Sequence, residues 1–340
     1  MTAISPDPNQ SVLVLGAGSW GTALALVLAR SGVATFLWDC DSAHIQTLKA
    51  AQENPRHLPG IPFPDCLFPI TDLKEPGSGI ADVVVAVPCE SLRSALETLR
   101  VTRGTDLQLC LASKGLEPDT LLLNHEVAAI CLGPVPCAVL SGPSFAAEVA
   151  RGLPTVVTIA AIAAGTAEHF AERFHCDTFR IYTHDDVIGV QVGGAVKNVM
   201  AIAAGISDGL GFGANARAGL ITRGLAEIMR LGIAMGGRHE TFMGLAGLGD
   251  LVLTCTDDQS RNRRLGLALA RGMTLANATR DIGQAIEGVR TASVVVDLAR
   301  KHGIEMPISE QVQQVIGGRE TPAAAVQNLL RRQRRGELKI

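Results

Sequence analysis

Short apolar runs alternate with helix-like segments along the first half of the chain. The first run, residues 11–15, leads into a glycine-rich turn, and residues 22–30 then have the character of a helix that Gly32 ends. Further apolar runs predict strands at residues 34–38, 81–87, 107–112 and 137–140, and helical segments separate most of them. This alternation predicts an α/β fold with a parallel, doubly wound sheet.

The pattern changes near residue 185. Residues 155–160 and 178–182 predict two more strands that extend the sheet, but after them apolar residues recur at helical spacing between glycine or polar breaks. We therefore expect a first, sheet-containing domain at residues 1–185 and an all-helical second domain at residues 186–340. Residues 55–69 contain five prolines and interrupt the alternation, which indicates an excursion on the surface.

The composition narrows the class of protein. Of the 340 residues 47% are hydrophobic, enough for large cores, and the net charge of −3 gives no field that would hold nucleic acid. Residues 1–10 lack the order typical of a signal peptide, and the longest apolar stretch, residues 153–164, is shorter than the roughly 18 residues that span a bilayer. The eight cysteines include no CxxC pair. We expect a cytoplasmic protein with reduced thiols, no metal site and no membrane insertion.

The glycine-rich turn has the spacing of a dinucleotide-binding fingerprint. Gly16, Gly18 and Gly21 follow an apolar strand and open a helix at the start of a βαβ pattern, which is the context that this fingerprint requires. The glycines let the backbone approach a pyrophosphate, and the amides near Ser19 and Trp20 lie at the positive end of the helix dipole. The first domain is therefore expected to bind a dinucleotide, and a merely tight turn is the alternative.

Asp39 follows the second predicted strand, eighteen residues after Gly21. A carboxylate at this place accepts from the adenosine ribose hydroxyls and would repel a 2′-phosphate. Since no lysine or arginine follows until Lys49, we expect NAD to be preferred over NADP. The alternative is that Asp39 only caps the next segment.

Three more strand ends are expected at the same edge of the sheet, where ligands of doubly wound folds bind. Pro88 stops the third strand where a nicotinamide would arrive, and Lys114 follows the fourth strand within reach of a cofactor or an anionic substrate. Ser141 ends the fifth strand, and Ser144 is expected to cap a helix whose free amides face an anion. An ordinary exposed lysine and a purely structural cap are the alternatives.

Residues 191–200, QVGGAVKNVM, place a lysine on a small, apolar helix face. At helical spacing the neighbours of Lys197 are Val190, Gly194 and Ala201, so no acidic partner lies on its own helix. An unpaired lysine partly removed from water has a lowered pKa, which makes Lys197 our candidate for proton transfer. The alternative is a lysine whose stem lies along apolar surface while its ammonium reaches water.

The helical half contains three further polar groups. Asp250 and Thr254 lie four residues apart and would share one helix face, with Lys197 as the expected partner of the carboxylate. Ser260, Arg261 and Asn262 begin a segment with three arginines, which would clamp a phosphate together with the amides of a helix start. Glu287 stands close to glycines and would contact a cofactor ribose or amide. A solvated basic face and a glutamate facing water are the alternatives.

Six motifs together resemble those of bacterial NAD(P)-dependent sn-glycerol-3-phosphate dehydrogenases, in matching order and spacing over about residues 11–330. They are Gly16-Ala-Gly-Ser-Trp-Gly21, Ser113-Lys-Gly115, Ser141-Gly-Pro143, Gly193-Gly-Ala-Val-Lys-Asn198, Gly247-Leu-Gly-Asp250 and Ser260-Arg-Asn-Arg263. The resemblance implies a nucleotide-binding domain, an all-helical domain and a homodimer. It also implies reversible reduction of dihydroxyacetone phosphate to sn-glycerol 3-phosphate for phospholipid synthesis, with NAD or NADP as cofactor.

The resemblance also implies roles for individual residues. Lys197 matches the family's proton donor and acceptor, and Lys114 matches a lysine that contacts both cofactor and substrate. The implied substrate contacts are Gly142, Ser144, Asp250, Ser260, Arg261 and Asn262, and the implied cofactor contacts are Ser19, Trp20, Cys40, Ala146, Arg261, Ala285 and Glu287. Cys40 stands where many relatives carry a basic or imidazole group, and Ala285 where a larger aliphatic residue is common, so both departures bear on the cofactor preference.

Two other functions are compatible with the same residues. One is a β-hydroxyacid dehydrogenase, which also pairs a helix lysine with a dinucleotide domain but acts on a carboxylate. The other is a non-catalytic NADH-sensing protein, in which Lys197 and Asp250 would form only a structural pair. Turnover of phosphorylated against carboxylated ketones separates the two enzymes, and a sensor would oxidise no NADH.

Overall fold

The computed structural model describes residues 11–77 and 79–331, which form two compact units. The first unit comprises the described residues up to 113 together with 124–140 and 144–187, and the second comprises 114–123, 141–143 and the described residues from 188 onward. A single division at residue 185 therefore misses two short segments that belong with the second unit. Leu116 and Leu123 explain the first of them, because both side chains are buried in the second unit's hydrophobic core.

An eight-stranded sheet forms the centre of the first unit. In spatial order its strands are β10 (Phe179–His184), β9 (Thr155–Ala161), β8 (Cys137–Ser141), β7 (Gln108–Leu111), β6 (Asp82–Val85), β1 (Val12–Leu15), β2 (Thr35–Trp38) and β5 (Leu67–Ile70). Strand β1 pairs in parallel with β2 on one side and with β6 on the other. The strand order thus reverses at β1, which confirms the doubly wound α/β class and places the switch point at the glycine turn.

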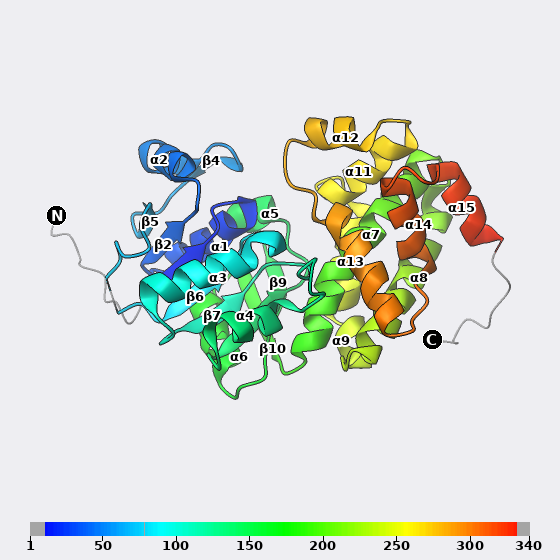
Figure 1. Ribbon diagram of the computed structural model, residues 1–340. Helices are drawn as coiled ribbons and strands as arrows, with labels where there is room; N and C mark the ends of the chain where they lie inside the picture. The colour runs from blue at the N-terminus through cyan, green and yellow to red at the C-terminus, as the bar shows by residue number, and fades with distance from the viewer. Residues whose placement is uncertain (1–10, 78, 332–340) are drawn as a thin grey trace. The chain divides into compact units, whose positions relative to one another are not determined.

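Helices complete the described part of the first unit (Figure 1). They are α1 (Ser19–Arg30), α2 (Ser42–Ala51), α3 (Cys89–Arg103), α4 (Asn124–Leu132), α5 (Ala146–Ala150) and α6 (Thr166–Phe174). Helix α1 packs against α5 and α6, whereas α3 packs against α4. Apolar residues of α1 such as Leu24, Leu26 and Leu28 are fully buried in the core that the helices share with β1.

The proline-rich segment is part of the fold, contrary to the expected surface excursion. Strands β3 (Glu53–Asn54) and β4 (Leu58–Pro62) form an antiparallel pair, and β5 pairs in parallel with β2. The prolines obscured this strand in the sequence, but β5 is the last strand of the sheet, where a proline such as Pro69 is tolerated. Phe68 stacks on Phe36 of β2 with ring centroids 5.3 Å apart.

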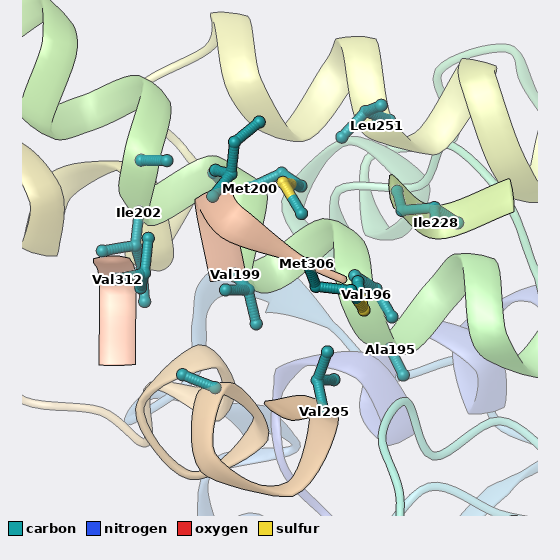
Figure 2. Packing of buried hydrophobic residues seen from close by; sticks show 14 of the residues in the cluster. Ala195, Val196, Val199, Met200, Ile202, Ile228, Leu251, Val295, Met306 and Val312 are labelled. Atoms are coloured by element: carbon teal, nitrogen blue, oxygen red, sulfur yellow. The ribbon is translucent and has the colours of Figure 1, made fainter. Parts of the chain in front are cut away.

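The second unit is helical in its described residues. Its elements are α7 (Val187–Gly209), α8 (Gly213–Ala234), α9 (His239–Met243), the π-helix η2 (Leu245–Gly249), α10 (Asp250–Thr256), α11 (Arg261–Ala270), α12 (Leu275–Ile282), α13 (Glu287–Lys301), α14 (Pro307–Ile316) and α15 (Pro322–Leu330). Helix α7 is central: its residues Val196, Val199 and Met200 are buried among side chains of α8, α10, α13 and α14 (Figure 2).

Helix α7 is also, among the described residues, the one helix with the length and hydropathy of a membrane span. Residues 153–164, the apolar stretch considered from the sequence, instead contain strand β9. In the structure 94% of the most apolar window of α7 is buried, which is the property of a core helix.

Glycines allow α7 to approach α11 closely. A Cβ atom at Gly205 would lie 2.1 Å from the carbonyl oxygen of Arg263, and one at Gly266 would lie 2.1 Å from that of Ile202. Neither contact is possible for a larger residue without moving a backbone. The two glycines therefore fix the spacing between the helix that carries Lys197 and the helix that begins after Ser260.

Candidate active site

The local structure differs at each of the three glycines of the fingerprint. Gly16 has φ +104°, and a Cβ there would lie 2.8 Å from the carbonyl oxygen of Ala86, just after β6. A Cβ at Gly21 would lie 1.9 Å from the oxygen of Gly16, so only glycine permits this close turn. A Cβ at Gly18, the N-cap of α1, would meet nothing within 4 Å. The space beside Gly18 is thus open, and the absence of a side chain there would let a pyrophosphate approach the backbone at the start of α1.

Asp39 is tied to this turn. One carboxylate oxygen accepts from the backbone N–H of Ala17 at 2.8 Å, and the other accepts from that of Asp41 at 3.0 Å. The cap of α2 is Asp41, whose side chain accepts from the N–H of His44, so Asp39 does not cap that helix itself. The carboxylate is half-buried beside the glycine turn, the place expected for a group that contacts a ribose.

Two residues that the sequence analysis did not assign hold the other side of the same turn. The carbonyl oxygen of Ala17 accepts from Asn54 Nδ2 at 2.9 Å and lies 3.1 Å from His44 Nε2. Asn54 Nδ2 also lies 2.8 Å from the Thr22 hydroxyl. Helix α2 and strand β3 thereby anchor the glycine turn.

The remaining residues expected at the cofactor lie in different settings. Ser19 and Trp20 begin α1, Pro88 is the exposed N-cap of α3, and Cys40 is exposed after β2. Partial burial, with a smaller contribution from the Asp39 carboxylate, raises the pKa of the Cys40 thiol. Arg56 places a positive charge at this end of β2, because its Nη1 lies 3.9 Å from the Asp41 carboxylate. The sequence did not predict a cation here, since Arg56 lies beyond Lys49 in the chain.

Ser144 does not occupy the predicted N-cap position. Ala146 is the first residue of α5, and the N-cap is Phe145, whose side chain makes no capping hydrogen bond. The five-residue helix α5 thus begins one position later than the serine spacing predicted.

In the second unit, one carboxylate lies between two lysines. Asp250 Oδ1 accepts a short hydrogen bond from Lys197 Nζ, and Asp250 Oδ2 accepts from Lys114 Nζ at 2.9 Å. Lys114 Nζ also donates to the carbonyl oxygen of Gly142 at 3.2 Å. The Asp250 side chain is 1% exposed and that of Lys197 is 8% exposed. Two ammonium groups and one carboxylate leave an excess positive charge, which suits an oxygen that becomes negative during a reaction.

Lys197 pairs with Asp250, as predicted, although its own helix offers no acidic partner. Burial lowers the pKa of Lys197 to about 8, with Asp250 opposing this shift and Lys114 adding to it. The lowered pKa follows from removal from water rather than from the lack of an acidic partner. A buried lysine that titrates near neutral pH is suited to both donating and accepting a proton.

Local sequence explains how the pair is assembled. A Cβ at Gly193 would lie 2.5 Å from the carbonyl oxygen of Ala246, so this glycine lets α7 approach the π-helix η2 that leads into Asp250. A Cβ at Gly194 would lie 2.6 Å from the Ser141 hydroxyl. Thr254 lies one turn after Asp250, as expected, and its hydroxyl donates to the backbone carbonyl of Asp250 at 2.6 Å. A π-helix at such a place is typical of functional sites.

The start of α11 differs in detail from the expected phosphate clamp. Ser260 is the N-cap and accepts from the N–H of Arg263 at 3.2 Å, as predicted. The side chain of Asn262 is occupied within the protein: it donates to Asn198 Oδ1 at 2.9 Å and accepts from the N–H of Gly288 at 2.9 Å. The backbone amides of Arg261 and Asn262 donate to no group within residues 11–77 and 79–331. A ligand contact of Asn262 would therefore use its amide N–H rather than its side chain.

Asn198 connects this helix start to α13. Asn198 directly follows Lys197 in the sequence, and its Nδ2 donates to Glu287 Oε2 at 2.9 Å. Since its Oδ1 accepts from Asn262, Asn198 connects Asn262 to Glu287 through two hydrogen bonds. Gly288 must be glycine, because a Cβ there would lie 2.5 Å from Asn262 Oδ1. This role of Asn198 could not be predicted from its motif, because both partners are distant in sequence. Ala285 is exposed in the preceding loop, where Arg261 Nη1 lies 3.4 Å from Gln284 Oε1.

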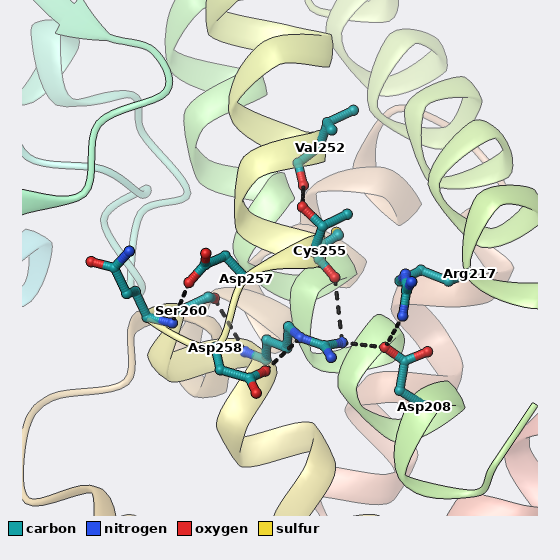
Figure 3. Close-up of polar contacts among 10 residues, drawn as sticks. Asp208, Arg217, Val252, Cys255, Asp257, Asp258 and Ser260 are labelled. Atoms are coloured by element: carbon teal, nitrogen blue, oxygen red, sulfur yellow. Dashed lines mark hydrogen bonds and ion pairs between the residues drawn. The ribbon is translucent and has the colours of Figure 1, made fainter. Parts of the chain in front are cut away.

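Arg263 does not belong to the phosphate clamp. Its guanidinium pairs with Asp208 at the end of α7 and, through Nε, with Asp258 at 2.9 Å. Arg217 of α8 pairs with the same Asp208 oxygen at 2.6 Å (Figure 3). These carboxylates hold Arg263 away from any ligand and fix the start of α11. Of the adjacent arginines, Arg261 is the half-buried one that has no carboxylate partner in the described chain.

The described residues contain no group of three or more histidine, cysteine, aspartate or glutamate side chains that could hold a metal ion. All eight cysteines are free thiols.

Chains that join a Rossmann-type turn to acid–base groups on a helical unit form a known class, the dinucleotide-dependent dehydrogenases, and this chain has both parts. Two family models match it: the N-terminal part of NAD-dependent glycerol-3-phosphate dehydrogenase at residues 11–167, and the C-terminal part of the same enzyme at residues 186–327. The chain therefore belongs to the NAD-dependent glycerol-3-phosphate dehydrogenase family, and it is an NAD(P)-dependent oxidoreductase.

Individual relatives agree with this assignment. The chain is 56% identical over 330 residues to glycerol-3-phosphate dehydrogenase [NAD(P)+] of Nitrosococcus oceani, covering 97% of this chain and 96% of the relative. It is 51% identical over 332 residues to the enzyme of the same name from Xanthomonas campestris, covering 97% of each. The crystal structure of glycerol-3-phosphate dehydrogenase from Coxiella burnetii superposes with a TM-score of 0.93 at 48% identity, covering 96% of this chain and 100% of that one.

Proposed function

We propose that this chain catalyses the reversible reduction of dihydroxyacetone phosphate to sn-glycerol 3-phosphate, a precursor for phospholipid synthesis. The observation that carries the proposal is the burial of Asp250 between Lys114 and Lys197, which gives one proton-transfer group and one further cation at a single place. A carboxylate substrate, as used by β-hydroxyacid dehydrogenases, is disfavoured by membership of the family. Intact acid–base groups disfavour a purely sensing protein.

NAD(P)H, when bound, supplies the hydride that reaches C2 of the ketone. Negative charge then develops on the C2 oxygen, and Lys197 donates its proton to that oxygen while Lys114 supplies a second positive charge. In the reverse direction neutral Lys197 accepts the proton of the C2 hydroxyl. Asp250 orients both lysines, because each of its oxygens accepts from one of them.

The substrate phosphate is assigned to the start of α11. The amides of Arg261 and Asn262 and the Arg261 guanidinium form a cationic place for it, and Ser260 shapes the turn as N-cap. Binding energy from the phosphate positions C2 for reaction. Gly142, Ser144 and Thr254 complete the proposed substrate contacts.

The cofactor is assigned to the glycine turn, whose open Gly18 and first α1 amides at Ser19 and Trp20 fit a pyrophosphate. Asp39 and Cys40 would contact the adenosine ribose, and Pro88, Ala146, Ala285 and Glu287 complete the proposed contacts. We propose NAD as the preferred cofactor, because a carboxylate held by the turn repels a 2′-phosphate. We also propose a homodimer that acts in the cytoplasm, without membrane insertion or a nucleic-acid partner.

Substitution of Lys197 tests the central assignment. Lys197→Ala should lower kcat by roughly 10²-fold or more, because proton transfer to the C2 oxygen is lost. NADH binding, followed by fluorescence titration, should remain. The exposed Lys301→Ala serves as a matched control and should turn over normally. Near-normal turnover of Lys197→Ala would refute the proposed mechanism.

A further inference from the structure

Ser141 contributes a buried hydroxyl to the lysine site. Ser141 is the last residue of β8 and belongs to the second unit. It is only 4% exposed. Its Oγ lies against α7 where Gly194 has no side chain, 2.6 Å from the position of a Cβ there. Lys114 Cγ lies 4.0 Å from the same position. Gly194 and Lys197 are three residues apart on one helix face, so this hydroxyl faces the turn of α7 that carries the proposed proton donor.

The Ser141 hydroxyl has no hydrogen-bond partner among the described residues. Two other buried serines show the usual arrangement: Ser260 Oγ accepts from the N–H of Arg263, and Ser309 Oγ lies 3.2 Å from the Glu227 carboxylate. Buried hydroxyl groups in folded proteins almost always have a partner. A hydroxyl that is buried beside the two lysines, and that the described part of the chain leaves without a partner, is therefore suited to bind a polar atom of the substrate.

The proposed substrate leaves one polar group unassigned. The C2 oxygen is assigned to Lys197 and Lys114, and the phosphate to the start of α11. The third group is the free hydroxyl on the carbon next to C2, which is neutral and both donates and accepts hydrogen bonds. A serine hydroxyl has the same two capacities, whereas the neighbouring Gly142 carbonyl already accepts from Lys114.

We propose that Ser141 binds the free hydroxymethyl group of the substrate and thereby sets specificity for hydroxymethyl ketones over methyl ketones. This inference rests on the proposed function, since it assigns a further group of the same substrate. Ser141 takes no part in proton transfer. It is a specificity-determining residue whose hydroxyl distinguishes a substrate that has the hydroxyl from one that lacks it.

The test compares dihydroxyacetone phosphate with acetol phosphate, in which a methyl group replaces the hydroxymethyl group. The full-length protein and Ser141→Ala are assayed for kcat/KM with both ketones under saturating NADH. The substitution should lower kcat/KM for dihydroxyacetone phosphate by about tenfold, the loss of one hydrogen bond, and leave that for acetol phosphate nearly unchanged. The melting temperature should not fall, because the removed hydroxyl has no partner among residues 11–77 and 79–331.

Two further variants sharpen the result. Ser141→Cys keeps the size of the side chain with a weaker hydrogen-bond donor, and should give an intermediate preference between the ketones. Ser309→Ala removes a buried serine hydroxyl that does have a partner, and should lower the melting temperature without changing the preference. An unchanged preference in Ser141→Ala, or equal losses for both ketones with a lower melting temperature, would overturn the inference. Absence of dihydroxyacetone phosphate reduction by the unsubstituted protein would instead contradict the proposed function.

Discussion

Two opposing effects set the pKa of Lys197. Burial disfavours the ammonium and lowers the pKa to about 8, while the Asp250 carboxylate favours the ammonium and limits the shift. Lys114 adds a second positive charge that lowers the pKa further. The protonated and neutral forms of Lys197 are therefore both accessible close to neutral pH, as a reversible reaction requires.

The pH dependence of both directions follows from this pKa. Ketone reduction needs the ammonium, so its kcat/KM should fall as the pH rises through about 8, whereas alcohol oxidation needs the neutral amine and should rise over the same range. Asp250→Asn removes the group that raises the pKa, so both transitions should move to lower pH. Thr254→Val, which alters a neutral neighbour of Asp250, is the control and should leave their position nearly unchanged. A transition that stays near 8 in Asp250→Asn would argue against Lys197 as the titrating group.

We expect the preference for NAD over NADP to depend on the side chain of Asp39. Asp39→Asn removes the negative charge but keeps an oxygen that accepts from the N–H of Ala17, so the glycine turn stays anchored. The ratio of kcat/KM for NADP to that for NAD should rise by about tenfold, since repulsion of the 2′-phosphate is lost. Asp41→Asn, two residues away at the cap of α2, is the matched control. Equal or better use of NADP by the unsubstituted protein would end the proposed NAD preference.

At the scale of elements, the close contact between α7 and α11 connects the two halves of the proposed substrate site. Gly205→Ala would force its Cβ onto the carbonyl oxygen of Arg263, only 2.1 Å away, so the helices must separate. We expect a loss of about 1–3 kcal/mol in the free energy of unfolding, and a raised KM for the phosphorylated substrate because the start of α11 moves. Denaturant titration and steady-state kinetics measure the two effects.

Gly219→Ala provides the matched control for that substitution. Gly219 lies in the exposed part of α8, where a Cβ meets nothing within 4 Å. Alanine should stabilise this helix by roughly 0.5–1 kcal/mol through its better helix propensity, with KM unchanged. If both substitutions had the same effect on stability, the close contact at Gly205 would not explain the spacing of α7 and α11.

Elements with strong local signals could be predicted from the sequence, and those defined by distant contacts could not. The glycine turn and the Ser260 cap depend on a few adjacent residues, and the pairing of Asp250 with Lys197 followed from the shortage of other partners. Strand β5 was missed because its proline, Pro69, is acceptable only at a sheet edge, a property of the assembled sheet.

The same limit applies to the details of the site. Asn262 is bonded to Asn198 across 64 positions and Lys114 to Asp250 across 136, and no periodicity in the sequence reports such contacts. The sequence does not distinguish the arginines that follow Ser260, yet in the structure Asp208 and Asp258 form ion pairs with Arg263. Residue type thus indicated the chemistry of the site, whereas folding decided which side chains remain available to a ligand.

At the scale of the whole molecule, a buried carboxylate makes stability depend on pH. Glu227 of α8 is 2% exposed and accepts from the backbone N–H groups of Ile308 and Ser309, at 2.7 Å and 3.2 Å, at the start of α14. Burial raises the pKa of Glu227 to about 7, although these hydrogen bonds oppose the shift. Folding therefore favours the protonated form of this side chain relative to the unfolded chain.

The sign of the effect is fixed by linkage. A carboxyl group whose pKa is raised by folding contributes stability below its unfolded pKa of about 4.5, and that contribution is lost as the pH rises through about 7. The loss should be on the order of 3 kcal/mol, from about 1.4 kcal/mol for each pKa unit. The glutamine in Glu227→Gln cannot ionise, so this variant does not lose that contribution. Between pH 4.5 and 7.5 the unfolding free energy of the unsubstituted protein should therefore fall relative to that of the variant. Urea titrations at several pH values measure this difference, and a difference that does not vary with pH would mean that Glu227 does not titrate in this range.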